Sequence, residues 1–155
     1  MALRLATLLA AAVALAAGCS IPTEQRTAEQ VMRELVVRVG PAQPSVVFTA
    51  ETDPNGLLGR PGGYTSKATF VDDRIDVSQV VDNQPGAVDL GGSVEVFENA
   101  AGARQRADYV EQVTQALPAF AEYDYVFGPV LLRVSGQLTP GQAAAYEAAL
   151  AEIVG

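Results

Sequence analysis

The chain has 155 residues and a formal net charge of −8, with no histidine, no tryptophan and one cysteine, Cys19. This acidic balance argues against nucleic acid as a partner, because nucleic acid requires a basic face. Zinc and copper sites normally draw on histidine or thiolate ligands, so we expect no such metal site and no cofactor.

Residues 1–18 have the features of a signal peptide. Arg4 supplies the only charge, and the apolar run from Leu5 to Ala17 is interrupted only by Thr7. This run is shorter than the ~20 residues that a membrane-spanning helix needs. We therefore predict that residues 1–18 are removed and that a short tether, residues 19–26, precedes a single domain over residues 27–155.

The four residues Ala16-Ala17-Gly18-Cys19 resemble the lipoprotein box of bacteria. In that family a diacylglycerol is attached to the cysteine sulfur, and cleavage leaves this cysteine as the first mature residue. The resemblance implies lipidation at Cys19 and anchoring on the extracytoplasmic face of the cell membrane. The alternative is an ordinary secreted protein whose cysteine happens to lie near the cleavage site.

The first elements of the domain are predicted to be a helix and a short strand. Thr27 and Gln30 have the spacing of a capping box, apolar residues then recur at helical spacing, and Gly40-Pro41 ends the pattern. The apolar run 46–50 predicts a strand, after Pro44 has ended the connection. Residues 53–63, with four glycines and two prolines, predict a shaped loop.

The middle of the domain alternates in polarity. Residues 64–71 predict a strand with Tyr64, Ala68 and Phe70 on one side and Lys67 and Thr69 on the other. Residues 72–92 are acidic and interrupted by Pro85-Gly86 and Gly91-Gly92, which favours an exposed excursion. Residues 94–97 predict a further strand.

The last elements are two helices around a strand-like segment. Asn99 is expected to cap a helix that runs to about Leu117, and Thr139 to cap a final helix over the remaining residues. Residues 123–134 predict one strand with a bend at Gly128-Pro129. The whole order favours an α+β fold, a two-layer sandwich with a mostly antiparallel sheet of about four strands packed by helices. A ferredoxin-like arrangement fits part of this order.

The glycine-rich loop is the best candidate for a binding site. Its free backbone amides, together with nearby cations, are suited to an anion or a peptide carboxylate. The candidate ligand-binding residues are Arg60, Gly62, Gly63, Tyr64 and Lys67. The alternative is that the glycines only permit a tight connection and that Arg60 pairs with an acid.

No residue pattern predicts catalysis. Ser66 and Lys67 are neighbours on a predicted strand, so their side chains should point to opposite faces and cannot form a serine–lysine pair. The acidic pairs Asp72/Asp73, Glu95/Glu98 and Glu122/Asp124 leave a carboxylate-dependent cell-wall hydrolase as a remote alternative. We expect a protein that is not an enzyme.

Three segments resemble small uncharacterised actinobacterial lipoproteins. They are residues 53–67, residues 92–97, and residues 123–136 with their Gly128-Pro129 step. The resemblance implies an extracytoplasmic, lipid-anchored protein of the cell envelope. The expected function is non-enzymatic binding or scaffolding. The expected partners are the membrane, through the lipid on Cys19, and an envelope protein or small ligand; the alternative is binding of a small anion or peptide by loop 53–67.

Overall fold

The computed structural model describes residues 25–155, so the predicted leader and Cys19 lie outside the described residues. Five strands form one antiparallel sheet in the order β1-β2-β3-β5-β4. The strands are β1 (Ala42–Val47), β2 (Ser66–Asp72), β3 (Gly91–Val96), β4 (Glu122–Phe127) and β5 (Val130–Ser135). The predicted α+β class with an antiparallel sheet is confirmed, with five strands where about four were expected.

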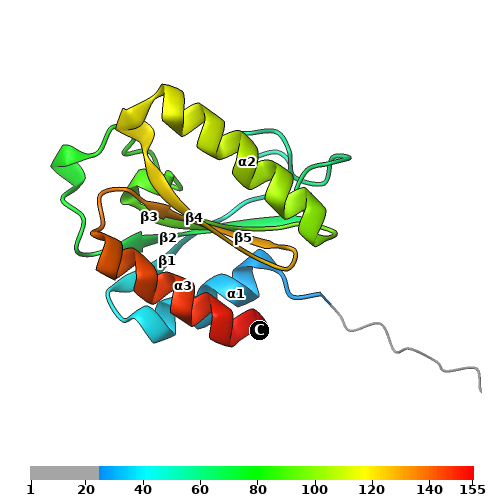
Figure 1. Cartoon of the computed structure of the whole chain (residues 1–155), viewed down its shortest axis with the longest axis horizontal. Helices are drawn as coiled ribbons and strands as arrows, with labels where there is room; N and C mark the ends of the chain where they lie inside the picture. Colours follow the sequence, from blue (N-terminus) through cyan, green and yellow to red (C-terminus); the bar gives the residue numbers. More distant parts are fainter. Residues whose placement is uncertain (1–24) are drawn as a thin grey trace, which may run out of the picture.

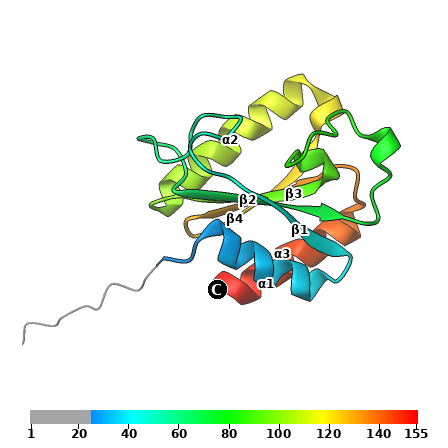
Figure 2. The ribbon, with the colours of Figure 1, turned by 180° about the vertical axis from the view of Figure 1, so that it is seen from behind.

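Three helices cover the sheet: α1 (Ala28–Val39), α2 (Ala100–Ala116) and α3 (Pro140–Val154). Helices α1 and α3 lie side by side on one face, and α2 lies on the other, as Figures 1 and 2 show. Both faces are therefore covered, whereas a two-layer sandwich was expected. No α-helix separates β1 from β2, which differs from the βαββαβ order of a ferredoxin-like arrangement.

The helix caps predicted from the sequence are present. Thr27 and Gln30 form a reciprocal capping box at the start of α1, and Thr139 and Gln142 form another at the start of α3. The Asn99 side chain accepts hydrogen bonds from two backbone amides in the first turn of α2. Each cap satisfies amides that have no partner inside the helix.

The main core lies between the sheet and the pair α1 and α3. Alternate residues of β2, β3 and β5 point into it, because successive side chains of a strand face opposite sides. These residues are Ala68, Phe70, Val94, Val96, Val130, Leu132 and Val134. The Phe70 ring stacks on that of Tyr146 from α3, with 5.0 Å between the ring centroids.

The predicted single strand over residues 123–134 is wrong: two strands are present. Gly128-Pro129 forms the turn between β4 and β5, and Gly128 has a φ of 54°, which glycine adopts without strain. The fifth strand of the sheet comes from this hairpin.

The first residues of β1 and β3 also differ from the predicted strand starts. Strand β1 begins at Ala42 and contains Pro44, which is tolerated because β1 lies at the edge of the sheet. Gly91 and Gly92 lie inside β3 rather than before it. A side chain at either position would collide with the backbone of the neighbouring strand, so glycine here serves close packing.

Tyr64 lies on the opposite side from the one predicted. It precedes β2 and packs edge-on against Phe97, in a small cluster with Ala103 and Leu131 on the α2 side of the sheet. The irregular loop before it turns the chain, so the strand alternation does not extend back to residue 64.

Candidate functional site

Polar residues occupy the face of the sheet beneath α2. The alternation that sends Ala68 and Phe70 to the main core sends Lys67 and Thr69 to this side. Alternate residues of β3, β5 and the edge strand β4 point to this side in the same way. The polar face consists of Lys67, Thr69, Ser93, Glu95, Glu122, Asp124, Arg133 and Ser135.

A chain of alternating charges runs diagonally across this polar face. Lys67 of β2 lies opposite Glu95 of β3 in the strand register. Glu95 accepts from Arg133 of β5 at 3.3 Å, and Arg133 donates two further bonds to Glu122 of β4, at 2.9 and 3.0 Å. Arg106 of α2 reaches the other oxygen of Glu95 at 3.3 Å. The helix is therefore joined to the sheet by ion pairs as well as by apolar contacts.

Lys67 is buried, with only 4% of its surface exposed. Its ammonium lies 3.5 Å from Asp53 Oδ1 and 4.7 Å from the centroid of the Phe48 ring. The Asn55 amide, oriented so that its oxygen faces the surrounding donors, accepts from Lys67 Nζ at 3.1 Å and from Arg106 at 3.3 Å. Burial lowers the pKa of Lys67, and the neighbouring carboxylates of Glu95 and Asp53 oppose this effect.

Asp53 organises the glycine-rich loop from inside. Its Oδ2 accepts from the backbone amides of Leu57 and Leu58, at 2.8 and 3.1 Å, and its Oδ1 accepts from the Tyr64 hydroxyl at 2.6 Å. Burial opposes ionisation, but these hydrogen bonds and the nearby Lys67 together lower the pKa of Asp53. The loop is thus held by a carboxylate that is also the nearest anion to Lys67.

A cavity of about 280 Å³ opens over this network, between the polar face, α2 and two loops. Its charged and amide-bearing walls come from the loops around residues 54–55 and 82–89, from the sheet and from α2. Its apolar walls come from α2 and from the segment after it. We call it the charged cavity. Its walls include Asn55, Lys67, Asp82, Asp89, Arg106, Glu122 and Arg133, together with Val110, Val113 and Phe120.

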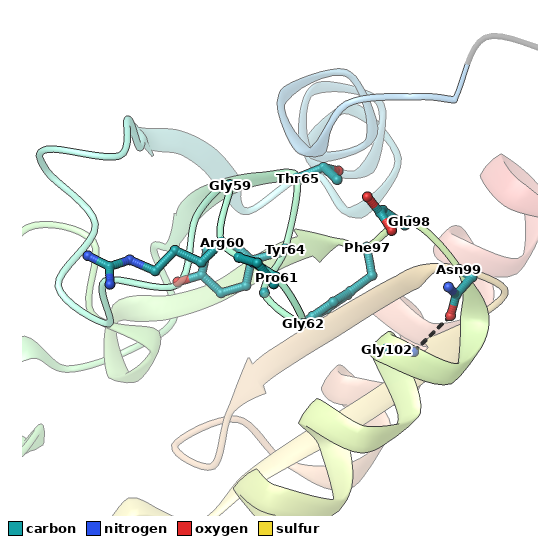
Figure 3. A pocket seen from close by; sticks show the side chains of 11 residues that line it. Gly59, Arg60, Pro61, Gly62, Tyr64, Thr65, Phe97, Glu98, Asn99 and Gly102 are labelled. Atoms are coloured by element: carbon teal, nitrogen blue, oxygen red, sulfur yellow. Dashed lines mark hydrogen bonds between the residues drawn. The ribbon is translucent and has the colours of Figure 1, made fainter.

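Most of the residues predicted to bind a ligand surround a different space. Arg60, Gly62, Gly63 and Tyr64 line a hollow of about 430 Å³ beside the start of α2, where Asn99 caps the helix. Figure 3 shows the Arg60 side chain extending away from Phe97 and Asn99. Tyr64 is buried and its hydroxyl is already engaged by Asp53. The hollow therefore presents mainly backbone and no inward-directed cation from Arg60.

Lys67, the fifth residue predicted to bind a ligand, does not border this hollow and lines the charged cavity instead. The sequence did not predict that four other charged residues would lie around Lys67: Glu95, Arg106, Glu122 and Arg133. A signal was present, since charged residues alternate with apolar ones along three predicted strands. This alternation does not reveal the network, because nothing in the sequence shows that α2 covers this face.

Asp124 lies next to this network, opposite Arg133 in the register. Burial, together with the nearby Glu122 carboxylate, raises the pKa of Asp124 to about 7. Its Oδ1 is 4.0 Å from Arg133 and has no hydrogen-bond partner among residues 25–155. Asp124 and Glu122 also line a second hollow on the polar face, with Asp108 and Glu111 of α2.

The predicted lipidation site, Cys19, lies outside the described residues. Within residues 25–155, no helix combines the length and the apolar character needed to cross a bilayer. No protein-family model, curated protein or solved structure matches the chain.

Proposed function

We propose that this protein is a lipid-anchored, extracytoplasmic binding protein of the bacterial cell envelope, held at the cell membrane through Cys19 and without catalytic activity. The apolar leader, the small residues before Cys19 and the resemblance to actinobacterial lipoproteins support the anchor. Acyl chains bind a bilayer because each buried methylene contributes ~0.8 kcal/mol.

The charged cavity is the observation that supports a binding role. A buried ion network is rarely more stabilising than well-packed apolar residues of the same size. The opposite face of the same sheet carries such an apolar core. We therefore interpret the buried Lys67 and the half-buried Arg106 and Arg133, which border an open cavity, as retained for recognition.

Labelling with a palmitate analogue in living cells tests the anchor. We expect the wild-type protein to incorporate the label and to sediment with membranes, and the Cys19→Ala variant to lose both properties. Ser20→Ala, one residue further on, is the matched control and should label normally. Equal labelling of the wild type and the Cys19→Ala variant would contradict the proposal.

Ligand binding by loop 53–67 itself is a second candidate in the same class. It is favoured by the hollow that Arg60, Gly62, Gly63 and Tyr64 border. If this hollow binds small anions or peptide ends and Arg60 turns inward to meet them, Arg60→Ala should reduce the thermal shift that such compounds produce. An unchanged shift across a panel of anions and peptides would exclude a role for Arg60.

The Glu122/Asp124 pair favours a third candidate, a carboxylate-dependent cell-wall hydrolase. The two carboxyl groups border one hollow, and burial raises the pKa of both, but only Glu122 is hydrogen-bonded to Arg133. Glu122 is engaged by both bonds from Arg133, which leaves it poorly placed to attack or to activate water, and this ranks the candidate last. Release of fragments from purified cell walls by the wild type, abolished in Asp124→Asn, would establish it.

A further inference from the structure

The charged cavity has a basic end with donors to spare. Lys67 Nζ has two acceptors among the described residues, Asp53 at 3.5 Å and Asn55 at 3.1 Å, and Asp53 already accepts four shorter bonds. Arg106 makes two bonds of 3.3 Å, to Glu95 and Asn55, although a guanidinium carries five N–H donors. Glu95 is also shared with Arg133. This end therefore offers unused N–H donors to an additional carboxylate.

The other end of the cavity is acidic. Asp89 lies in the 3-10 turn Val88–Leu90, whose backbone is tied to β5 because the Ser135 hydroxyl donates to the Asp89 carbonyl at 2.9 Å. The Asp89 carboxylate accepts from the backbone amide of Asp82 at 3.0 Å. Within residues 25–155, no cationic side chain forms an ion pair with Asp82 or Asp89. These carboxylates are thus available to an ammonium group.

The strand register gives the separation of the two ends along the strand direction; Lys67 also lies two strands away from Ser135, and neighbouring strands are about 4.8 Å apart. Lys67 lies level with Glu95 and Leu131, while Ser135, which holds Asp89, lies four residues further along β5. Four residues of a strand span about 13 Å. An extended peptide of two or three residues spans about 7 to 11 Å, and the charged side chains at both ends cover the remainder.

The wall between the two ends is apolar. Val110 and Val113 of α2 border it, and so does Phe120, which follows the helix. Val113 and Phe120 remain 37% and 40% exposed, so this wall also opens to solvent. The volume of about 280 Å³ lies near the lower end of the ~300–1,000 Å³ typical of small-molecule sites.

We propose that the charged cavity binds a short zwitterionic peptide of two or three residues, with its carboxylate on Lys67 and Arg106 and its ammonium near Asp82 and Asp89. This inference rests on the proposed binding function and names its ligand class. Small apolar side chains of the peptide contact Val110, Val113 and Phe120. Because the cavity binds both charged termini of the peptide, blocking either terminus weakens binding.

Calorimetric titration of the full chain, purified in detergent from whole cells, tests the proposal with trialanine as the probe. We expect saturable binding of trialanine, with affinity at least tenfold weaker for its C-terminal amide and for its N-acetyl form. Asp89→Asn should weaken trialanine binding at least threefold and leave binding of the N-acetyl form unchanged. Absence of heat with trialanine, or equal binding of the N-acetyl form, would overturn the proposal.

Two variants separate loss of the cavity from loss of the fold. Val113→Trp places a large side chain in the apolar wall without touching the ion network, and should abolish trialanine binding with a retained unfolding transition. Arg104→Gln, on the exposed side of α2 and outside the cavity, should bind as the wild type does. The titration does not depend on Cys19, so a failed anchor and an empty cavity give different results.

Discussion

The two faces of the sheet are built from the same strands but from opposite chemistry. The face toward α1 and α3 is an apolar core in which the fully buried residues include Phe70, Val94 and Leu132. The face toward α2 has charges at the same level of the same strands, with Lys67 and Glu95 buried and Arg133 half-buried. One helix covers the charged face, and its only fully buried residues are Ala103 and Val110.

This difference assigns separate roles to the two faces. Burial of apolar surface stabilises a fold without directional requirements, at about 25 cal/mol per Å². Buried charges contribute little net stability but fix geometry, and they are strongly destabilising when one partner is lost. The α1 and α3 face therefore supplies most of the stability, and the α2 face supplies the specific arrangement around the charged cavity.

Two adjacent residues of β5 should show the largest difference in stability between the two faces. Leu131 and Leu132 are both fully buried but point to opposite faces. We expect Leu132→Ala to lower the free energy of unfolding by about 4 kcal/mol, because it leaves a cavity inside the large apolar core. Leu131→Ala should cost about 2.5 kcal/mol, since its small cluster can relax toward the loop and α2. Denaturant unfolding of both variants measures this difference, and equal losses would contradict it.

The apolar face is the part that the sequence predicted well. Helical spacing predicted the helix that begins after Thr27, and strand alternation placed Ala68 and Phe70 on one side, which is the core side. These predictions succeed because they depend on periodicity, which is local information. Capping boxes at Thr27 and Thr139 were equally local and were confirmed.

The charged face could not be predicted because it depends on tertiary packing. Alternation showed that Lys67 points away from the apolar core, but a polar strand face is solvated unless another element covers it. Whether α2 would do so depends on the strand order, which places the β4–β5 hairpin beside β3. Taking β4 and β5 as one strand removed this information. It also hid the proximity of Arg133 and Glu122.

The second-largest effect is expected at Glu95, the shared partner of two arginines on the charged face. Glu95→Gln keeps the volume but removes the charge that faces Arg106 and Arg133. Removing one member of a buried ion network typically costs about 3 kcal/mol or more, because the remaining charges stay buried. We expect a loss of about 3 kcal/mol in chemical denaturation.

Glu98 provides the matched control, because it lies three residues further along the chain and is exposed. Glu98→Gln should change the stability by less than about 0.5 kcal/mol. If Glu95→Gln has an equally small effect, the ion network is not buried in solution, and the contrast between the two faces is weaker than the structure indicates.

A smaller, pH-dependent effect is expected at Asp124. Its pKa is raised from 3.8 to about 7 by burial and by Glu122, so folding favours the protonated form. The stability contributed by this carboxyl group is fully present below pH 4 and is lost as the pH rises toward 7. Asp124→Asn removes this loss, and the variant should be more stable than the wild type by about 2 kcal/mol at pH 8.

Unfolding curves at pH 4.5, 6 and 8 for the wild type and Asp124→Asn measure this dependence. Glu98→Gln, which is exposed and lies outside the hollow that Asp124 borders, should follow the wild-type pH profile. An Asp124→Asn variant whose stability declines between pH 4.5 and 8 as steeply as that of the wild type would show that Asp124 ionises normally in the fold.

The smallest expected difference concerns local opening of the helices. Helix α3 buries five residues in the apolar core, whereas α2 buries two and leaves Tyr109 and Leu117 more than half exposed. Helices with little apolar burial open locally at lower free energy. Native-state hydrogen exchange should therefore give amides in the middle of α2 an opening free energy at least about 1 kcal/mol below those of α3. Because α2 forms one wall of the charged cavity, saturating trialanine should raise the exchange protection of α2 and leave that of α3 unchanged. Equal protection of the two helices without peptide would show that the ion network holds α2 as firmly as apolar packing holds α3.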